Sequence, residues 1–67
     1  MARQSAMRDL VNHPGDTLLG KFRRFGEHGV AYEVIGSEDV DHVRIRVVES
    51  GETLRYPIRD ARTDPEA

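Results

Sequence analysis

The chain has 67 residues, a formal net charge of −2 and no cysteine. This length holds one small domain, and the lack of cysteine excludes disulfides and thiolate metal sites. Because a core of this size rarely contributes more than about 3–5 kcal/mol, such domains usually need further stabilisation. We therefore expect either a homo-oligomer or a domain that binds a partner.

The chain divides by composition into three expected parts. These are an N-terminal extension (1–15), an antiparallel β-domain (16–61) and a flexible C-terminal tail (62–67). No apolar stretch reaches the length of a membrane span, and the charged start MARQSAMRDL lacks the apolar region of a signal peptide. We expect a cytoplasmic protein that does not bind membranes.

The N-terminal extension carries a helical pattern. Met7, Leu10 and Val11 have helical spacing, Ser5 is a suitable N-cap, and His13-Pro14-Gly15 would end the element. The pattern predicts a short helix over residues 5–12. An isolated helix of this length is marginal in water, so it would have to pack on the domain or on another subunit.

Four apolar segments separated by turn compositions predict four strands, over residues 17–25, 30–35, 42–48 and 53–59. Apolar and polar residues alternate in the last three, as in half-buried strands. In the first, Phe25 is out of phase with Leu18 and Phe22 unless Arg23-Arg24 forms a bulge. The predicted fold is mainly β: a small four-stranded antiparallel meander, curled in an SH3-like or barrel-like manner, with the short N-terminal helix.

The last two predicted strands form a hairpin whose register follows from the apolar pattern. A two-residue turn at Ser50-Gly51 aligns Val47 with Leu54 and therefore places Arg46 opposite Arg55. A loop with an odd number of residues would set apolar residues against arginines, so the loop must be even, and a four-residue loop with the same register is the alternative. Pro57 cannot donate a ladder hydrogen bond, which favours an edge strand.

The face opposite the predicted core is rich in basic residues. It would carry six basic side chains and one acid, Glu33, and hence a charge of +5. We interpret it as a surface that binds an anion or an acidic partner, with solvated strand decoration as the alternative. The basic residues are Lys21, Arg23, Arg44, Arg46, Arg55 and Arg59.

Apolar residues on the same face favour a protein partner. Ile35 and Val48 would be contacts within an arginine-rich rim. The sequence therefore favours a non-enzymatic interaction or regulatory module that binds an acidic protein surface, for example an accessory or antitoxin-like subunit, or that self-associates. Nucleic-acid binding by the same face is the alternative, although Tyr32 and Tyr56 are predicted on the core face and would not stack on bases.

Catalytic, metal and cofactor motifs are missing from the sequence. His13, His28 and His42 lack metal-ligand spacing, and the acidic cluster at residues 38–41 lacks the EF-hand pattern. We expect no catalytic residue, no metal and no cofactor. An enzyme would need a site assembled across subunits from residues such as His28, Glu33 and His42.

Several short motifs together carry a family resemblance across residues 18–66. The chain resembles a family of short uncharacterised bacterial proteins, a domain of unknown function. The resemblance implies a bacterial origin and one compact unit, and it brings no activity, cofactor or catalytic residue. The motifs are Arg24-Phe25-Gly26, Tyr32-Glu33-Val34, Glu49-Ser50-Gly51-Glu52, Tyr56-Pro57 and Asp64-Pro65.

Overall fold

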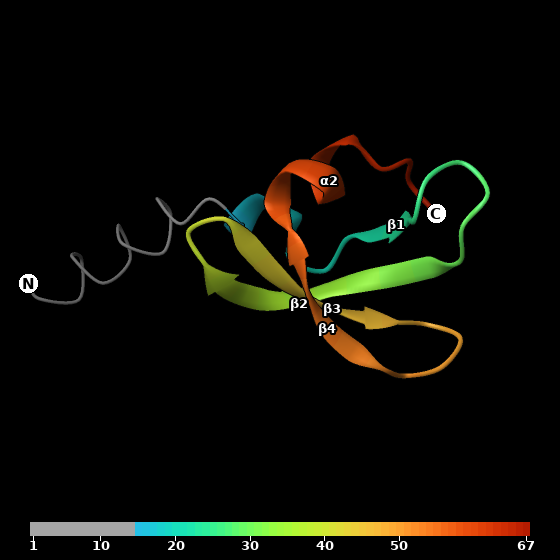
Figure 1. Cartoon of the computed structure of the whole chain (residues 1–67), viewed down its shortest axis with the longest axis horizontal. Helices are drawn as coiled ribbons and strands as arrows, with labels where there is room; N and C mark the ends of the chain where they lie inside the picture. The colour runs from blue at the N-terminus through green and yellow to red at the C-terminus, as the bar shows by residue number, and fades with distance from the viewer. Residues whose placement is uncertain (1–14) are drawn as a thin grey trace, which may run out of the picture.

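The computed structural model describes residues 15–67, and its four strands form one antiparallel sheet in the order β1-β2-β3-β4 (Figure 1). The meander predicted from the sequence is confirmed, and the sheet is open. The helix predicted over residues 5–12 lies outside the described residues. The elements are η1 (Asp16–Leu18), β1 (Phe22–Arg24), β2 (Ala31–Asp39), β3 (His42–Val47), β4 (Thr53–Pro57) and α2 (Ile58–Thr63).

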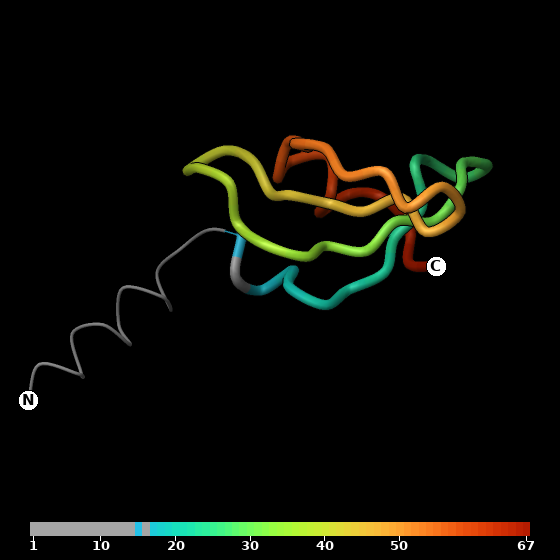
Figure 2. Tube along the Cα trace, turned by 90° about the horizontal axis from the view of Figure 1, so that it is seen from below, coloured from blue at the N-terminus to red at the C-terminus, as the bar shows by residue number. Residues whose placement is uncertain are grey.

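The described part of the molecule has two layers. The helix α2 lies on one face of the sheet, called the inner face here, and the C-terminus lies next to β1 (Figures 1 and 2). Among residues 15–67, no helix lies over the opposite, outer face. The core between the layers consists of Leu18, Tyr32, Val34, Val43, Ile45, Ile58 and Ala61, with Phe25, Leu54 and Tyr56 packed against it.

Buried and more exposed residues alternate along β2 and β3, as the sequence predicts. Tyr32 and Val34 of β2 and Val43 and Ile45 of β3 are fully buried. Residues between them point to the outer face, because successive side chains of a strand point to opposite faces. Burial of these four side chains is the main driving force that holds the central hairpin to the inner layer.

In β1 the prediction of which face each residue occupies is wrong. Leu18 is buried in the core, but Phe22 is 47% exposed and pairs with Glu33 on the outer face. Gly20, at φ +81°, separates them. A residue in this left-handed region interrupts the extended backbone, so the alternation that begins at Leu18 does not continue. Arg23, opposite Tyr32, consequently has inner-face parity.

Irregularities fall in β2 and not at Arg23-Arg24, where a bulge was considered. The β2–β3 register shifts between Val34 and Gly36 and again between Ser37 and Asp39. Each bulge adds one unpaired residue to β2. As a result β2 continues through the sequence GSED, which was predicted to be a loop.

The β3–β4 loop has the predicted even length but contains four residues, 48–51. Val47 N–H donates to the carbonyl of Glu52 at 2.8 Å, and Gly51 at φ +77° makes the turn. The register is therefore shifted by two, so that Arg44 and not Arg46 lies opposite Arg55. A shift of two leaves each side chain on its own face, so the apolar pattern could not distinguish the two registers.

The C-terminal segment differs from the prediction in two ways. Strand β4 ends at Pro57, and Ile58 begins α2 in place of continuing the strand. The tail expected to be flexible instead bonds to β1: Arg24 N–H donates to the carbonyl of Pro65 at 2.9 Å, and Ala67 N–H donates to the carbonyl of Phe22 at 3.0 Å. The β-domain thus includes residues 62–67.

Candidate functional site

The outer face is the candidate interaction surface, because neither the helix nor the tail covers it. Cross-strand neighbours on it follow from the register: Phe22 pairs with Glu33, Glu33 with Arg46, and Arg46 with Thr53. Its side chains come from all four strands and from the loop after β3: Phe22, Arg24, Ala31, Glu33, Ile35, Arg44, Arg46, Thr53, Arg55 and Val48.

Three ion pairs link β3 and β4 to β2. Arg44 donates to both carboxylate oxygens of Glu38, at 2.9 and 3.1 Å. This hydrogen bonding with Glu38 raises the pKa of Arg44 above its ordinary value. Arg46 Nη2 lies 2.8 Å from Glu33 Oε1.

The third ion pair connects β4 to the end of β2. Arg55 Nη1 lies 3.6 Å from Asp39 Oδ2. Asp39 also accepts from Asp41 N–H and contacts His42 Nδ1, each at 2.9 Å. The hydrogen bond with His42 is the main cause that holds the pKa of Asp39 below its ordinary value, followed by the bond from Asp41.

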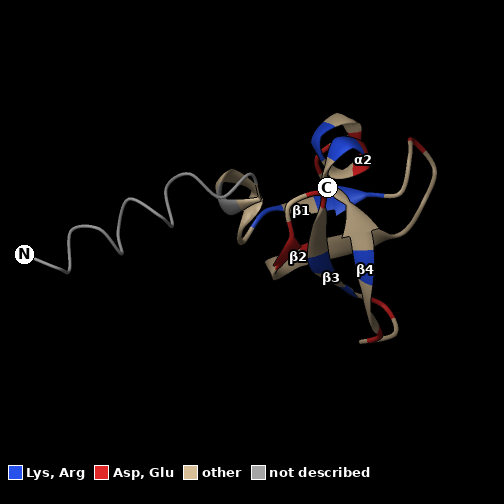
Figure 3. Ribbon diagram, turned by 60° about the vertical axis from the view of Figure 1, so that its left-hand side comes forward, with Lys and Arg blue, Asp and Glu red and all other residues tan. Residues whose placement is uncertain are grey.

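These pairs show that the prediction of a +5 face is wrong. The three outer-face arginines of β3 and β4 each have an acidic partner, so three positive charges meet three negative ones, and Arg24 of β1 is a fourth arginine on this face. Figure 3 shows basic residues of β3 and β4 beside acidic residues of β2. The two β2 bulges bring Glu38 and Asp39 into the sheet, which the sequence pattern could not reveal.

The like-charged pair is accommodated by the same acids. Arg44 and Arg55 are cross-strand neighbours, and like charges in that position repel. Arg44 turns to Glu38 and Arg55 turns to Asp39. Two arginines face to face are therefore part of a balanced group and need no external anion.

The other predicted basic residues do not join this group. Arg59 lies on α2, in the other layer. Arg23 has inner-face parity and its Nη1 donates to the carbonyl of Asp64 at 3.0 Å. Lys21 is exposed just before β1 and has the same parity as Arg23.

Two apolar side chains of the outer face are exposed to solvent. Phe22 is 47% exposed and Val48 54% exposed, whereas Ile35 at the first bulge is half-buried. Phe22 lies beside Glu33, and Val48 follows Arg46 by two residues. Sequence reasoning identified Ile35 and Val48 but missed Phe22. Gly20 was the only available signal that the alternation is interrupted before Phe22.

A second cluster lies on the inner face, where three aromatic rings meet one carboxylate. Ring centroids of Phe25 and Tyr32 are 4.5 Å apart, those of Phe25 and Tyr56 are 5.3 Å apart, and those of the two tyrosines are 5.2 Å apart. Tyr32 and Tyr56 donate their hydroxyls to Asp64 Oδ2 at 2.6 and 2.8 Å. Phe25, which is out of phase in the predicted first strand, thus packs within this cluster.

Both tyrosines of the cluster are neutral phenols. Burial, followed by the hydrogen bond to Asp64, raises the pKa of Tyr32 and of Tyr56 well above the ordinary 10.0. A phenol with so high a pKa is a poor general base or nucleophile near neutral pH. Because Asp64 belongs to the C-terminal tail and accepts both hydroxyl hydrogen bonds, the cluster anchors the tail to the sheet.

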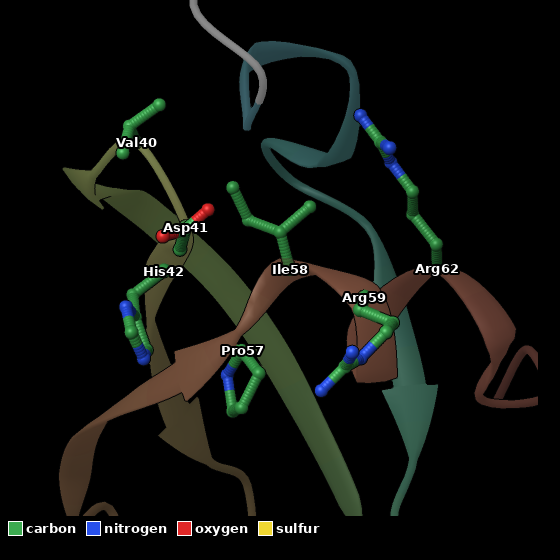
Figure 4. Close-up of a pocket in the computed structure, with 7 residues that line it drawn as sticks. All are labelled: Val40, Asp41, His42, Pro57, Ile58, Arg59 and Arg62. Atoms are coloured by element: carbon green, nitrogen blue, oxygen red, sulfur yellow. The ribbon is translucent and has the colours of Figure 1, made fainter.

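An open depression of about 730 Å³ lies at the β2–β3 turn and the start of α2 (Figure 4). Its charges are mixed, because two arginines from α2 face an aspartate and a histidine from the turn. Guanidinium groups can hold a carboxylate or phosphate, but this wall contains both signs and selects no ligand class. The lining residues are Val40, Asp41, His42, Pro57, Ile58, Arg59 and Arg62.

No metal centre is found within residues 15–67, where no three His, Cys, Asp or Glu side chains are grouped to hold an ion. The residues considered for a composite enzyme site are separated or engaged: His28 and His42 lie at opposite ends of β2, and Glu33 pairs with Arg46. In the described part of the chain, no helix has the length and apolar character needed to cross a membrane.

Comparison with known proteins places the chain in a family without assigning an activity. No curated protein matches it significantly. A family model matches residues 9–67, a longer stretch than the motifs indicated at its N-terminal end. The chain therefore belongs to DUF5397, a family of unknown function.

Proposed function

We propose that the protein is a non-enzymatic interaction module that binds a protein partner through the outer face of its sheet. One observation carries the proposal: Phe22 and Val48 are about half exposed on a sheet face that no described element covers. Aromatic residues and arginines with apolar neighbours are enriched in protein interfaces. An accessory or regulatory subunit, antitoxin-like in its role, would act in this way.

The charges of the face define what the partner should offer. Because Arg44, Arg46 and Arg55 already pair with acids of β2, a purely acidic partner would have to displace those pairs. A partner with an apolar pocket for Phe22 and a rim of mixed charge fits the face better. The proposed partner chemistry thus changes from acidic to apolar with polar edges.

The same charge balance weighs against nucleic acid as the ligand. Phosphate binding gains its affinity from unneutralised basic side chains that release counterions. Three of the arginines that would supply it are paired. Tyr32 and Tyr56 are also committed to Asp64 and cannot stack on bases.

A photocrosslinking experiment tests the proposal. A photoreactive phenylalanine analogue is placed at Phe22, at Val48 or at Val40, an exposed control in the β2–β3 turn. Each variant is expressed in the source cells and the adducts are identified by mass spectrometry. We expect one common partner from positions 22 and 48 and none from position 40.

Substitution then measures the contribution of the face. The double change Phe22→Ser and Val48→Ser should weaken binding of the crosslinked partner at least about tenfold, since each truncation of a central apolar contact costs 1 kcal/mol or more. Unchanged binding by the double variant would refute the proposal. Nucleic-acid binding at low salt that weakens steeply as salt rises would replace it with the alternative.

A further inference from the structure

The two edge strands of the sheet differ in whether their outer backbone groups are hydrogen-bonded. The edge at β1 is occupied by the tail: Arg23 and Glu66 form an antiparallel bridge, flanked by hydrogen bonds from Arg24 to Pro65 and from Ala67 to Phe22. Among the described strands, β4 pairs with β3 alone. On its other side no backbone hydrogen bond joins residues 53–57 to any part of the chain described in the structure.

The hydrogen bonds at the two ends of β4 show which backbone groups face outward. Val47 N–H donates to the carbonyl of Glu52, and Ile58 N–H donates to the carbonyl of Asp41, both at 2.8 Å. Residues 52 and 58 therefore direct their backbone N–H and carbonyl groups toward the β3 side. Because backbone direction alternates along a strand, residues 54 and 56 do the same, and residues 53, 55 and 57 direct theirs away from the sheet.

The outward groups form a short edge whose backbone N–H and carbonyl groups can pair with a further strand. Thr53 and Arg55 each present one N–H and one carbonyl, whereas Pro57 presents only a carbonyl. Natural edge strands are usually protected by lysine, by inward-pointing charges, by bulges or by proline. In β4 such devices are Pro57 at its end and the charged side chain of Arg55, which lies on the outer face and pairs with Asp39. The inner-face side chain between Thr53 and Arg55 is the half-buried Leu54.

We propose that this edge binds a second copy of the chain, whose β4 pairs antiparallel to the first about a two-fold axis at Leu54. Thr53 then pairs with the partner's Arg55, and Arg55 with the partner's Thr53, which gives four backbone hydrogen bonds. Leu54 faces the partner's Leu54 in a non-hydrogen-bonded pair, where side chains approach most closely. The two inner-face leucines cover each other.

Neighbouring registers are less favourable. An axis at Arg55 would place two Arg55 side chains opposite each other, which is destabilising, and would set Thr53 against Pro57, which lacks an N–H. An axis at Thr53 would set Arg55 against Gly51, whose φ of +77° is outside the extended range. Only the axis at Leu54 satisfies all four outward groups of the central residues.

This arrangement joins two four-stranded sheets into one continuous sheet of eight strands. It also supplies the extra burial that a core of this size needs, since the chain has no cysteine for a disulfide. The inference goes beyond the proposed function, because pairing at the β4 edge does not involve Phe22 or Val48. A failure of one would leave the other intact.

Sedimentation equilibrium across low micromolar to submillimolar concentrations provides the first test. We expect the mass to rise from 7.6 kDa toward twice that value. Thr53→Pro removes an outward N–H and leaves the bonds to β3 in place, so this variant should remain monomeric. Thr53→Val keeps the N–H and should dimerise like the wild type. Circular dichroism reports whether each variant is folded.

Disulfide trapping provides a second test that does not depend on a proline in the strand. Cβ atoms of directly opposite residues lie about 4.5–5.5 Å apart, close to the distance that a disulfide needs. Leu54→Cys should therefore form a covalent dimer under mild oxidation, and the exposed control Val48→Cys should not. A 7.6 kDa mass at every concentration together with no trapped Leu54→Cys dimer would overturn the proposal. Equal association of Thr53→Pro and wild type, or a species larger than two copies, would overturn it as well.

Discussion

Removing the Asp64 carboxylate should destabilise the whole domain. Its Oδ2 accepts hydroxyl hydrogen bonds from Tyr32 and Tyr56 at 2.6 and 2.8 Å. A hydrogen bond to a charged group contributes about 1.5–3 kcal/mol, and because both use one oxygen we assign about 3 kcal/mol to the pair. Total stability for a core of this size is about 3–5 kcal/mol, so Asp64→Ala should leave little of it.

The Asp64→Asn variant separates the contribution of the negative charge to stability from that of the hydrogen bonds. The amide keeps one acceptor oxygen but loses the negative charge, so we expect a loss of about 1.5 kcal/mol, half of that for alanine. With a urea dependence of about 1 kcal/mol per molar, the unfolding midpoint should fall by about 1.5 M for asparagine. For alanine the transition should lie near zero denaturant.

Urea unfolding followed by circular dichroism measures these losses. Glu66→Gln is the matched control, because it neutralises an exposed acid in the same tail. Hydrogen exchange of the Arg24 and Ala67 amides, which bond to Pro65 and Phe22, reports directly on whether the tail stays attached. An Asp64→Ala midpoint equal to that of Glu66→Gln, with both amides still protected, would refute the assignment.

Three further perturbations follow from the structure. The pKa of both cluster tyrosines is raised above 10.0 in the folded state, so their contribution to stability is complete below pH 10 and is lost as pH rises further; Tyr56→Phe should make the urea midpoint less sensitive to alkaline pH. Gly29→Ala should unfold the protein, because its Cβ would collide with the Phe25 backbone, whereas Gly36→Ala has open space and should change the melting temperature little. Arg46→Thr should destabilise slightly, and a double-mutant cycle with Glu33→Gln should give a coupling of about 0.2–1 kcal/mol; a stabilising effect would contradict the observed ion pair.

Local patterns predicted the fold and much of its core. Val43, Ile45, Tyr32 and Val34 alternate with polar residues over short distances, and this period is the direct signature of a half-buried strand. The same reasoning identified Val48 as an outward apolar residue. Such predictions succeed because each depends only on neighbouring residues.

Face and register assignments failed where one backbone conformation decides them. Gly20 at φ +81° reverses the faces of Phe22 and Arg23, and a turn that is two residues longer moves Arg55 from Arg46 to Arg44. Neither change alters the apolar period that the sequence displays. The predicted basic surface was wrong because Arg23 moved to the inner face, Arg59 lies on α2, and the β2 bulges bring Glu38 and Asp39 into the sheet.

Long-range contacts were the other source of error. Asp64 and Tyr32 are separated by 32 residues, and Arg23 and Asp64 by 41. A tail of charged and small residues has no local feature that indicates an anchor. The tyrosines were assigned to the core without any reason to expect a half-buried carboxylate partner.

The separation of 32 residues between Asp64 and Tyr32 also determines when the tail can attach to β2 during folding. Hairpins β2–β3 and β3–β4 close short loops, whereas the tail closes the longest ones, and the entropy of loop closure delays such contacts. The tail should therefore join after the rate-limiting step. Loss of the Asp64 contacts would then accelerate unfolding and leave the folding rate nearly unchanged, so the lifetime of the native state is set by the last residues of the chain.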